Sequence, residues 1–232
     1  MAVSAPRSAR PKHFPQPEDA GPEGLVAIGG VLEVDWLLDA YRHGIFPWPD
    51  AAYEPLLWWS PDPRAVIELA GLHISRRLRR TLRSGRFGVT ANQDFAGVID
   101  GCATTPGRVG ATWLTDEMID AYTALHTQGH AHSVEVWRED RLVGGVYGVA
   151  IGGAFAAESM FHRESDASKV AVAHLVEHLR GRGYGVLDIQ QWSSHTGRMG
   201  AREISRREYL KRLGEHRDRP VTFGDALVAP AW

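Results

Sequence analysis

The order of strand-like and helix-like segments after residue 62 constrains the fold of this chain more than any other feature. Strand-like runs occupy residues 86–92, 132–140, 142–161 and 184–190, and helix-like runs occupy residues 116–129 and 165–183. This alternation predicts a mixed α/β domain built on a sheet, and the longest run is long enough for two strands. The letters EDRL between two strand-like runs predict a hairpin, so part of the sheet should be antiparallel.

A proline-rich stretch at residues 47–63 divides the chain. Proline density of this kind predicts a domain boundary near residue 62, between a small N-terminal domain, 14–62, and a larger domain, 63–232. The first thirteen residues, MAVSAPRSARPKH, lack the apolar segment of a secretory signal. Residues 1–13 are therefore predicted to form a disordered tail.

Composition narrows the classes of function. With 26 Lys and Arg against 28 Asp and Glu, the net charge is -2, so nucleic-acid binding would need a local basic patch. The single Cys102 excludes an internal disulfide and a thiol cluster for zinc. No window approaches the roughly 20 apolar residues that cross a bilayer. These features predict a soluble cytoplasmic protein, and no metal site is predicted.

A local basic patch does occur, in HISRRLRRTLRSGR at residues 73–86. Its apolar residues recur at i, i+4 and i+8, which predicts one buried helical stripe, while a second stripe carries Arg76, Arg80 and Arg83. Guanidinium groups gathered on one side suit phosphates, which they bind through paired donors. The alternative is a solvated cationic face relieved by nearby carboxylates.

The strand-like letters GVLDIQ at residues 185–190 raise a second question. Read with period two, Val186, Asp188 and Gln190 share one face. An acid and an amide there indicate either a sheet face open to water or a polar pair facing a reaction cavity. Trp48 and Trp113, which lie near turns, similarly could plug a domain junction or form walls for a base, an apolar side chain or a peptide.

Eight short segments together resemble one family. GIFPW, WWSPDPR, LHISRRLRR, AHSVEVW, LVGGVYGV, ESMF, ASKVAV and HTGRMGA follow in the order found in the bacterial leucyl/phenylalanyl-tRNA-protein transferases. The resemblance runs from about Phe14 to about Leu213. It implies an α+β fold: a small N-terminal domain and an acetyltransferase-like (GNAT) domain with a mixed, largely antiparallel sheet. It also implies a monomer that uses neither metal nor coenzyme.

The activity implied by the resemblance is aminoacyl transfer. Such an enzyme takes Leu, Phe or, less readily, Met from its tRNA and attaches it to an N-terminal Arg or Lys of a protein, which marks that protein for the N-degron pathway. The resemblance assigns catalysis to Asp188, Gln190 and Glu158. Gln190 would orient the attacking amine, Asp188 would polarise it or accept its proton, and Glu158 would hold Gln190 or contact the basic acceptor side chain. Assistance by the ribose hydroxyl is the alternative.

The resemblance also implies sites for substrate. The donor side chain would enter an apolar pocket whose expected members, if they are not core residues, are Val146, Phe155, Val172, Leu175 and Leu187. The terminal adenosine and the aminoacyl end would meet aromatic side chains, namely Trp48, Trp113, Tyr41 and Tyr122. The acceptor-stem phosphates would contact Arg76, Arg80 and Arg83.

Two positions depart from the family pattern. Val31 stands where the family commonly has an acid, and Ser193 stands where it tends to have Asn, which puts in doubt any role that needs an amide there. Two other functions stay open on the sequence alone. One is a Fem-type aminoacyl-tRNA-dependent transferase with another amine acceptor. The other is a non-catalytic tRNA-binding protein, which would need the arginine helix but not the three polar residues.

Overall fold

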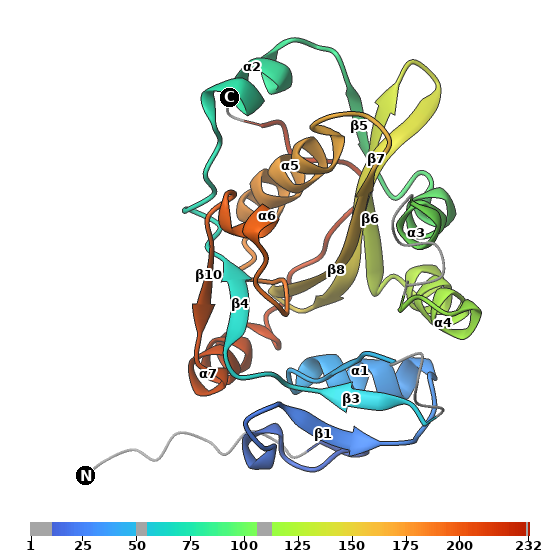
Figure 1. The fold of residues 1–232 in the computed structure, drawn as a ribbon, viewed down its shortest axis with the longest axis vertical. Coiled ribbons are helices and arrows are strands. Elements are labelled where there is room, and N and C mark those ends of the chain that lie inside the picture. Colours follow the sequence, from blue (N-terminus) through green and yellow to red (C-terminus); the bar gives the residue numbers. More distant parts are fainter. Residues whose placement is uncertain (1–10, 50–54, 106–112, 231) are drawn as a thin grey trace.

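The computed structural model describes residues 11–49, 55–105, 113–230 and 232. Two sheets organise this part of the chain, one of three strands and one of seven. The smaller sheet and one helix lie at one end of the molecule, and the larger sheet with its helices makes up the rest (Figure 1). The α+β class predicted from the sequence is confirmed.

The smaller sheet is antiparallel, with the order β1-β3-β2. Its strands are β1 (Leu25–Ile28), β2 (Phe46–Pro47) and β3 (Leu57–Trp59). The 3-10 helix η1 (Pro17–Asp19) precedes β1, and α1 (Val34–Arg42) lies between β1 and β2 in the chain. The backbone N–H groups of Lys12 and His13 donate to Asp39 Oδ2 at 2.8 and 2.9 Å. The end of the predicted tail is therefore attached to α1, while residues 1–10 lie outside the described residues.

The larger sheet has the order β10-β4-β9-β8-β7-β6-β5. Its strands are β4 (Arg64–Ile67), β5 (Gly88–Ala91), β6 (Ala131–Arg138), β7 (Arg141–Ile151), β8 (Ala154–His162), β9 (Val186–Asp188) and β10 (Ala201–Ile204). Within the described residues, β8 and β9 run parallel and the other neighbours pair antiparallel. The predicted hairpin joins β6 to β7, and the long apolar run forms two strands, so both predictions are confirmed.

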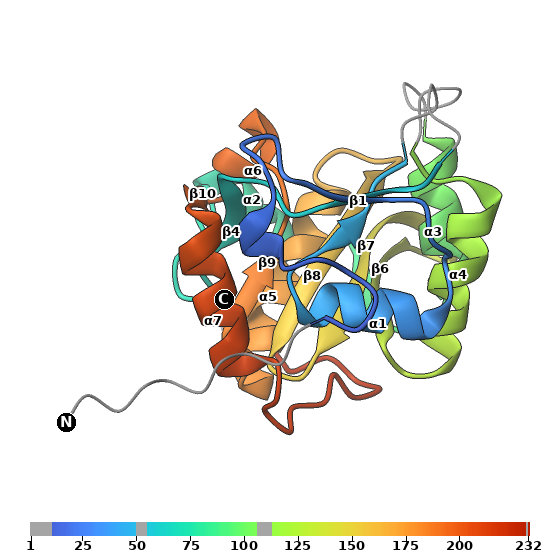
Figure 2. The same cartoon turned by 90° about the horizontal axis from the view of Figure 1, so that it is seen from below.

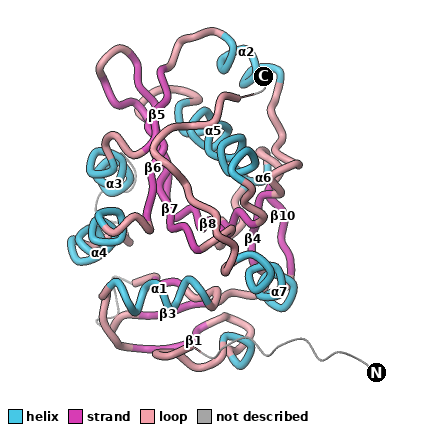
Figure 3. The backbone as a smooth tube through the Cα atoms, turned by 180° about the vertical axis from the view of Figure 1, so that it is seen from behind, coloured by secondary structure: helices cyan, strands magenta, loops and turns pink. Residues whose placement is uncertain are grey.

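Helices cover both faces of this sheet. They are α2 (Arg76–Arg83), α3 (Phe95–Thr104), α4 (Asp116–Thr127), α5 (Ala167–Arg182), α6 (Ser194–Gly197) and α7 (Arg206–His216). Seen from the front or from behind, α5 lies on one side of β6 and β7, and α3 and α4 lie on the other (Figures 1 and 3). No helix of the described chain is long and apolar enough to span a membrane.

The core is divided by the larger sheet. The α5 side packs Leu175, Val176 and Leu179 against strand residues such as Val134 and Val136. The opposite side joins α3 and α4 to the smaller sheet, because one cluster holds side chains from all of these elements. Figure 2 shows α1 beside the α3 and α4 layer. The small domain therefore packs on the larger one through the same apolar cluster that supports α4.

Candidate active site

Strands β8 and β9 separate close to the centre of the molecule. Their parallel pairing covers Ala154 to Ala156 on β8 and Val186 to Asp188 on β9, and it ends there. Two residues beyond the last paired residues, Gln190 Nε2 donates to Glu158 Oε1 at 2.8 Å. A carboxylate and an amide that are distant in sequence thus meet where the two strands part.

Irregular backbone aims both of these side chains. Tyr147 pairs with Ser159 and Gly148 with Ala157, so Glu158 is the extra residue of a β-bulge, a feature common beside active sites. Gly148 is required opposite the bulge because a Cβ there would lie 2.1 Å from the Ala156 carbonyl oxygen.

Gln190 occupies the left-handed region of the backbone map, with φ of 55°, just after β9 has ended. This turn places Gln190 with Leu187 and Ile189 on one cavity, whereas Asp188 lines another cavity beside Tyr209. The prediction that Asp188 and Gln190 share a strand face is therefore wrong, because period-two alternation holds only while the strand is regular.

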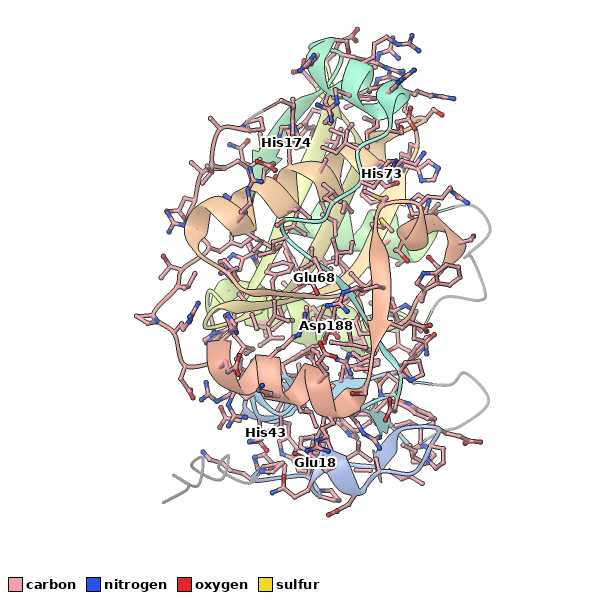
Figure 4. The ribbon with its side chains drawn as sticks, turned by 90° about the vertical axis from the view of Figure 1, so that its left-hand side faces the viewer. Glu18, His43, Glu68, His73, His174 and Asp188 are labelled. Carbon is pink, nitrogen blue, oxygen red and sulfur yellow. The ribbon has the colours of Figure 1, made fainter. Side chains whose placement is uncertain are left out.

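Asp188 is buried, and its carboxylate is fully engaged. Arg64 donates to its two oxygens at 2.8 and 2.6 Å, and the Tyr209 hydroxyl donates to Oδ2 at 2.9 Å. The backbone N–H of Gln190 donates to Oδ1 at 2.9 Å. Figure 4 shows Asp188 inside the molecule, next to α7. These contacts make Asp188 the support for the turn that carries Gln190.

Arg64 connects this support to the small domain. Its guanidinium lies between the rings of Phe46 and Tyr209, 4.7 and 4.4 Å from their centroids, and Nη1 donates to the Gly44 carbonyl at 3.0 Å. Burial opposes its charge, but Asp188 outweighs burial and raises the pKa of Arg64. The sequence analysis missed the roles of Arg64 and Tyr209. The available signal for Arg64 was its place directly before the apolar letters AVI, which predict a buried strand.

Glu158 is half-buried and belongs to a chain of hydrogen bonds. The Tyr122 hydroxyl donates to Glu158 Oε2 at 3.1 Å, and the Tyr41 and Tyr122 hydroxyls lie 2.6 Å apart. Burial raises the pKa of Glu158 to about 8, and the charge of Asp188 adds to this effect, while hydrogen bonds from the two tyrosines oppose it. Glu158 is therefore a carboxyl group able to exchange a proton near neutral pH.

Tyr41 and Tyr122, expected to contact substrate, lie behind Glu158 instead. Their side chains are 4% and 0% exposed, and neither lines the cavities that hold Gln190. Burial raises the pKa of both phenols well above the usual value, and the charge of Glu158 acts in the same direction. Both phenols consequently stay protonated and available as hydrogen-bond donors to the carboxylate.

An apolar pocket of about 160 Å³ opens beside Glu158 and Gln190. An engineered cavity of about 150 Å³ in another protein admits benzene, so this pocket suits one Leu or Phe side chain. Four of the five predicted members contribute to its wall: Val146, Val172, Leu175 and Leu187. Phe155 does not, because it is buried one layer behind and packs on Tyr184 and Phe223. The wall also includes residues that sequence analysis missed: Ile67, Ala157, Met160, Ile189, Thr196 and Met199.

Trp48 and Trp113 form the entrance. Both are half-buried and line a second pocket of about 120 Å³ that shares Glu158 and Gln190 with the first. Trp113 lines the apolar pocket as well. Flat rings at the mouth of a pocket can stack on a base or cover an apolar chain.

The arginine helix presents its predicted charges to solvent. Leu78 is buried, and Arg76, Arg80 and Arg83 are exposed without an ion pair among the residues that the structure describes. By contrast, Arg77 lies 3.3 Å from Asp166, and Arg86 lies 2.7 Å from Glu164. Carboxylates therefore neutralise Arg77 and Arg86, and the three predicted arginines remain available to bind a phosphate.

The two positions that depart from the family pattern lie outside the two pockets. Ser193 caps α6: its hydroxyl accepts the N–H of Thr196 at 3.1 Å. Its hydroxyl is thus engaged at the helix end. Val31 is 43% exposed and lines a larger groove between the small domain and α4.

An apolar pocket that ends on an amide and a carboxyl group of raised pKa is typical of an enzyme that moves a proton beside an apolar substrate group. Comparison with protein families identifies the particular class. Residues 66–214 match the leucyl/phenylalanyl-tRNA protein transferase family, and residues 30–62 match the N-terminal domain of the same family. The chain belongs to this family of aminoacyltransferases, as the sequence analysis predicted.

Relatives named leucyl/phenylalanyl-tRNA--protein transferase are similar over most of their length. The one from Solidesulfovibrio magneticus is 52% identical, covering 91% of this chain and 85% of the relative. The one from Anaeromyxobacter sp. is 51% identical and covers 94% of this chain and 94% of the relative. The one from Pseudomonas syringae is 50% identical and covers 90% of this chain and 91% of the relative. Among solved structures, a GCN5-related N-acetyltransferase from Kribbella flavida is 10% identical with a TM-score of 0.36, covering 72% of this chain and 59% of that chain.

Proposed function

We propose that the enzyme transfers Leu, Phe and, less readily, Met from aminoacyl-tRNA to the N-terminal Arg or Lys of proteins. It acts in the cytoplasm as a monomer, and its products enter the N-degron pathway. The observation that carries this proposal is the place of Glu158, a carboxyl group with a pKa of about 8 at the rim of the apolar pocket. A peptide α-amino group also has a pKa of roughly 8, so the two are matched for proton transfer.

The reaction follows from these groups. Nε2 of Gln190 is committed to Glu158, so its amide oxygen is the atom that accepts a hydrogen bond from the acceptor amine. The amine nitrogen attacks the ester carbonyl, passes its proton to Glu158, and forms the peptide bond. The ester C–O bond breaks, and the ribose oxygen leaves with the proton that Glu158 returns to it. Asp188 acts through the backbone of Gln190, because its own oxygens are already engaged.

The donor occupies the remaining features. Its side chain fills the apolar pocket, and Trp48 and Trp113 flank the terminal adenosine. The acceptor stem reaches α2, where Arg76, Arg80 and Arg83 contact phosphates. Figure 1 supports this division, because α2 lies at the opposite end of the molecule from the small domain.

A transfer assay tests the proposal. Radiolabelled Leu-tRNA and Phe-tRNA are presented to identical peptides that begin with Arg, Lys or Ala, and the label in peptide is counted. Label is expected on the Arg and Lys peptides and not on the Ala peptide. Label on a muropeptide amine instead would favour a Fem-type acceptor, and tRNA binding without transfer to any amine would favour a binding protein.

Changing the depth of the apolar pocket should change the choice of donor. Val172 lines the pocket from α5. We expect Val172→Phe to lower the ratio of Phe to Leu transfer by about tenfold or more, because a few buried carbons discriminate by that amount. Val172→Ala should move the ratio in the opposite direction. Competition between the two charged tRNAs measures the ratio, and equal ratios in the three proteins would contradict this placement of the donor.

The three exposed arginines should govern the salt dependence of tRNA binding. Replacing Arg76, Arg80 and Arg83 by Gln should weaken binding and flatten the log–log salt dependence by roughly 0.9 for each phosphate that the protein no longer neutralises. A salt titration of fluorescent tRNA measures the slope. Arg207→Gln, an exposed arginine on α7, is the matched control and should leave it unchanged. If Arg207→Gln flattened the slope equally, the salt dependence of tRNA binding would reflect the net charge of the protein rather than the arginines of α2.

A further inference from the structure

A groove of about 900 Å³ lies between the small domain and α4, outside the two pockets already described. One wall comes from residues 29–34, together with Pro49, Pro55 and Leu56, and the other comes from Trp113 and α4. We call it the acidic groove. Small-molecule sites span roughly 300–1,000 Å³, so a groove of this size accommodates a short peptide segment.

The described lining of the groove carries one sign of charge. Its ionisable lining residues within the described chain are three carboxylates, Glu33, Glu117 and Asp120, and that lining includes no Lys, Arg or His. All three are exposed, and none forms an ion pair with another described residue. Glu33 precedes α1 but makes no capping hydrogen bond with its side chain. The three carboxylates therefore remain available to a cationic ligand, and they repel phosphates.

The acidic groove adjoins the reaction site. Trp113 lines the groove and both pockets, and Pro49 of the groove directly follows Trp48 of the entrance. The groove lies on the small-domain side of the site, whereas the exposed arginines of α2 lie at the other end of the molecule (Figure 1). The cationic surface of α2 and the acidic groove therefore lie toward opposite ends of the molecule.

We propose that the acidic groove binds the first residues of the acceptor polypeptide and selects those with cationic side chains. The proposal rests on the function proposed above and adds the acceptor's binding site to it. With the α-amino group held at Glu158 and Gln190, the chain continues past Trp113, and Glu33, Glu117 and Asp120 face its basic side chains. The apolar stems of the acceptor's basic side chains pack on Val31, Leu56 and Met118, which also line the groove.

Isosteric neutral variants test this site. The double variant Glu117→Gln and Asp120→Asn should raise KM for an Arg-initiated peptide by about tenfold, since each exposed pair contributes a small amount. Its kcat and its KM for Leu-tRNA should stay at the wild-type values. The rise in KM should shrink with added salt, which screens exposed charges. Glu33→Gln, on the opposite wall, should add to the effect.

Asp116→Asn is the matched control, because Asp116 is exposed in the same first turn of α4 but does not line the groove. It should leave both KM values unchanged. Unchanged peptide KM in the double variant and in Glu33→Gln, or an equal rise in the control, would overturn the acidic groove as the acceptor site. Failure of the wild-type enzyme to label any Arg or Lys peptide would instead refute the proposed function itself. A thermal melt of each variant separates weaker binding from failure to fold.

Discussion

Replacing Glu158 by Gln is expected to lower the rate of transfer by about 10²–10⁴-fold, the usual contribution of a general base. Gln keeps the size of the side chain and can still hydrogen bond to Gln190 and Tyr122, which are the partners of Glu158. It cannot accept the proton of the amine. Binding of Leu-tRNA should therefore persist while kcat falls, and single-turnover transfer with saturating tRNA measures the decrease.

The same variant should change the pH profile. Attack requires a neutral amine and an ionised Glu158, whose pKa is raised to about 8 by burial. Below both pKa values the wild-type rate depends on losing two protons, so its logarithm should rise with pH with a slope of about two. In Glu158→Gln the amine alone titrates, and the slope should fall to about one. The wild-type rate should level off above the two pKa values.

Glu203→Gln provides the control, since Glu203 is an exposed carboxylate on β10 that lines neither pocket. It should reproduce the wild-type rate and slope. A Glu158→Gln enzyme that keeps its rate would show that the proton leaves by another route, and the ribose hydroxyl of the tRNA would become the leading acceptor. A 2′-deoxyadenosine terminus on the tRNA would then test that route directly.

The largest expected effect on stability is that of Arg64→Met. The carboxyl group of Asp188 would be left in the interior without the guanidinium that now contacts both of its oxygens. Removing one partner of a buried ion pair destabilises proteins by about 3–5 kcal/mol. The rings of Phe46 and Tyr209 would also lose the cation between them. Urea unfolding monitored by tryptophan fluorescence measures the change in the free energy of unfolding.

Two comparisons separate the contribution of the buried ion pair from the effect of replacing any arginine by Met. Arg202→Met breaks the exposed pair between Arg202 and Glu68 and should cost about 1 kcal/mol or less. Arg64→Met combined with Asp188→Leu should cost less than Arg64→Met alone, because no unpaired charge is left in the interior. If Arg64→Met costs no more than Arg202→Met, the contact between Arg64 and Asp188 contributes no more to stability than an exposed ion pair.

The regular parts of the fold could be predicted because their signals are local. The apolar runs that form β6, β7 and β8 alternate or continue over strand length, and glycine ends α5 in a left-handed cap at Gly183. The arginine helix was predicted from its spacing alone, and Leu78 packs inward as expected. Which arginines would pair with carboxylates could not be predicted, because the partners of Arg77 and Arg86, Asp166 and Glu164, lie far away in sequence.

The geometry of the site escaped prediction for a physical reason. Period-two reasoning assumes a continuous strand, and both Glu158 and Gln190 occupy positions where the strand is interrupted, one by a bulge and one by a left-handed residue. The family resemblance supplied the residue types. It did not reveal that Asp188 is held by Arg64, or that Tyr41 and Tyr122 lie behind Glu158, because these contacts join five segments that are distant in sequence.

The hydrogen bond between Tyr41 of α1 and Tyr122 of α4 has a wider meaning for this enzyme. It joins the two domains directly behind Glu158, and the Tyr122 hydroxyl in turn donates to Glu158 Oε2. Burial raises the pKa of Glu158, while hydrogen bonds from the two tyrosines lower it. How readily this carboxyl group takes up a proton is therefore set partly by Tyr41, a residue of the other domain.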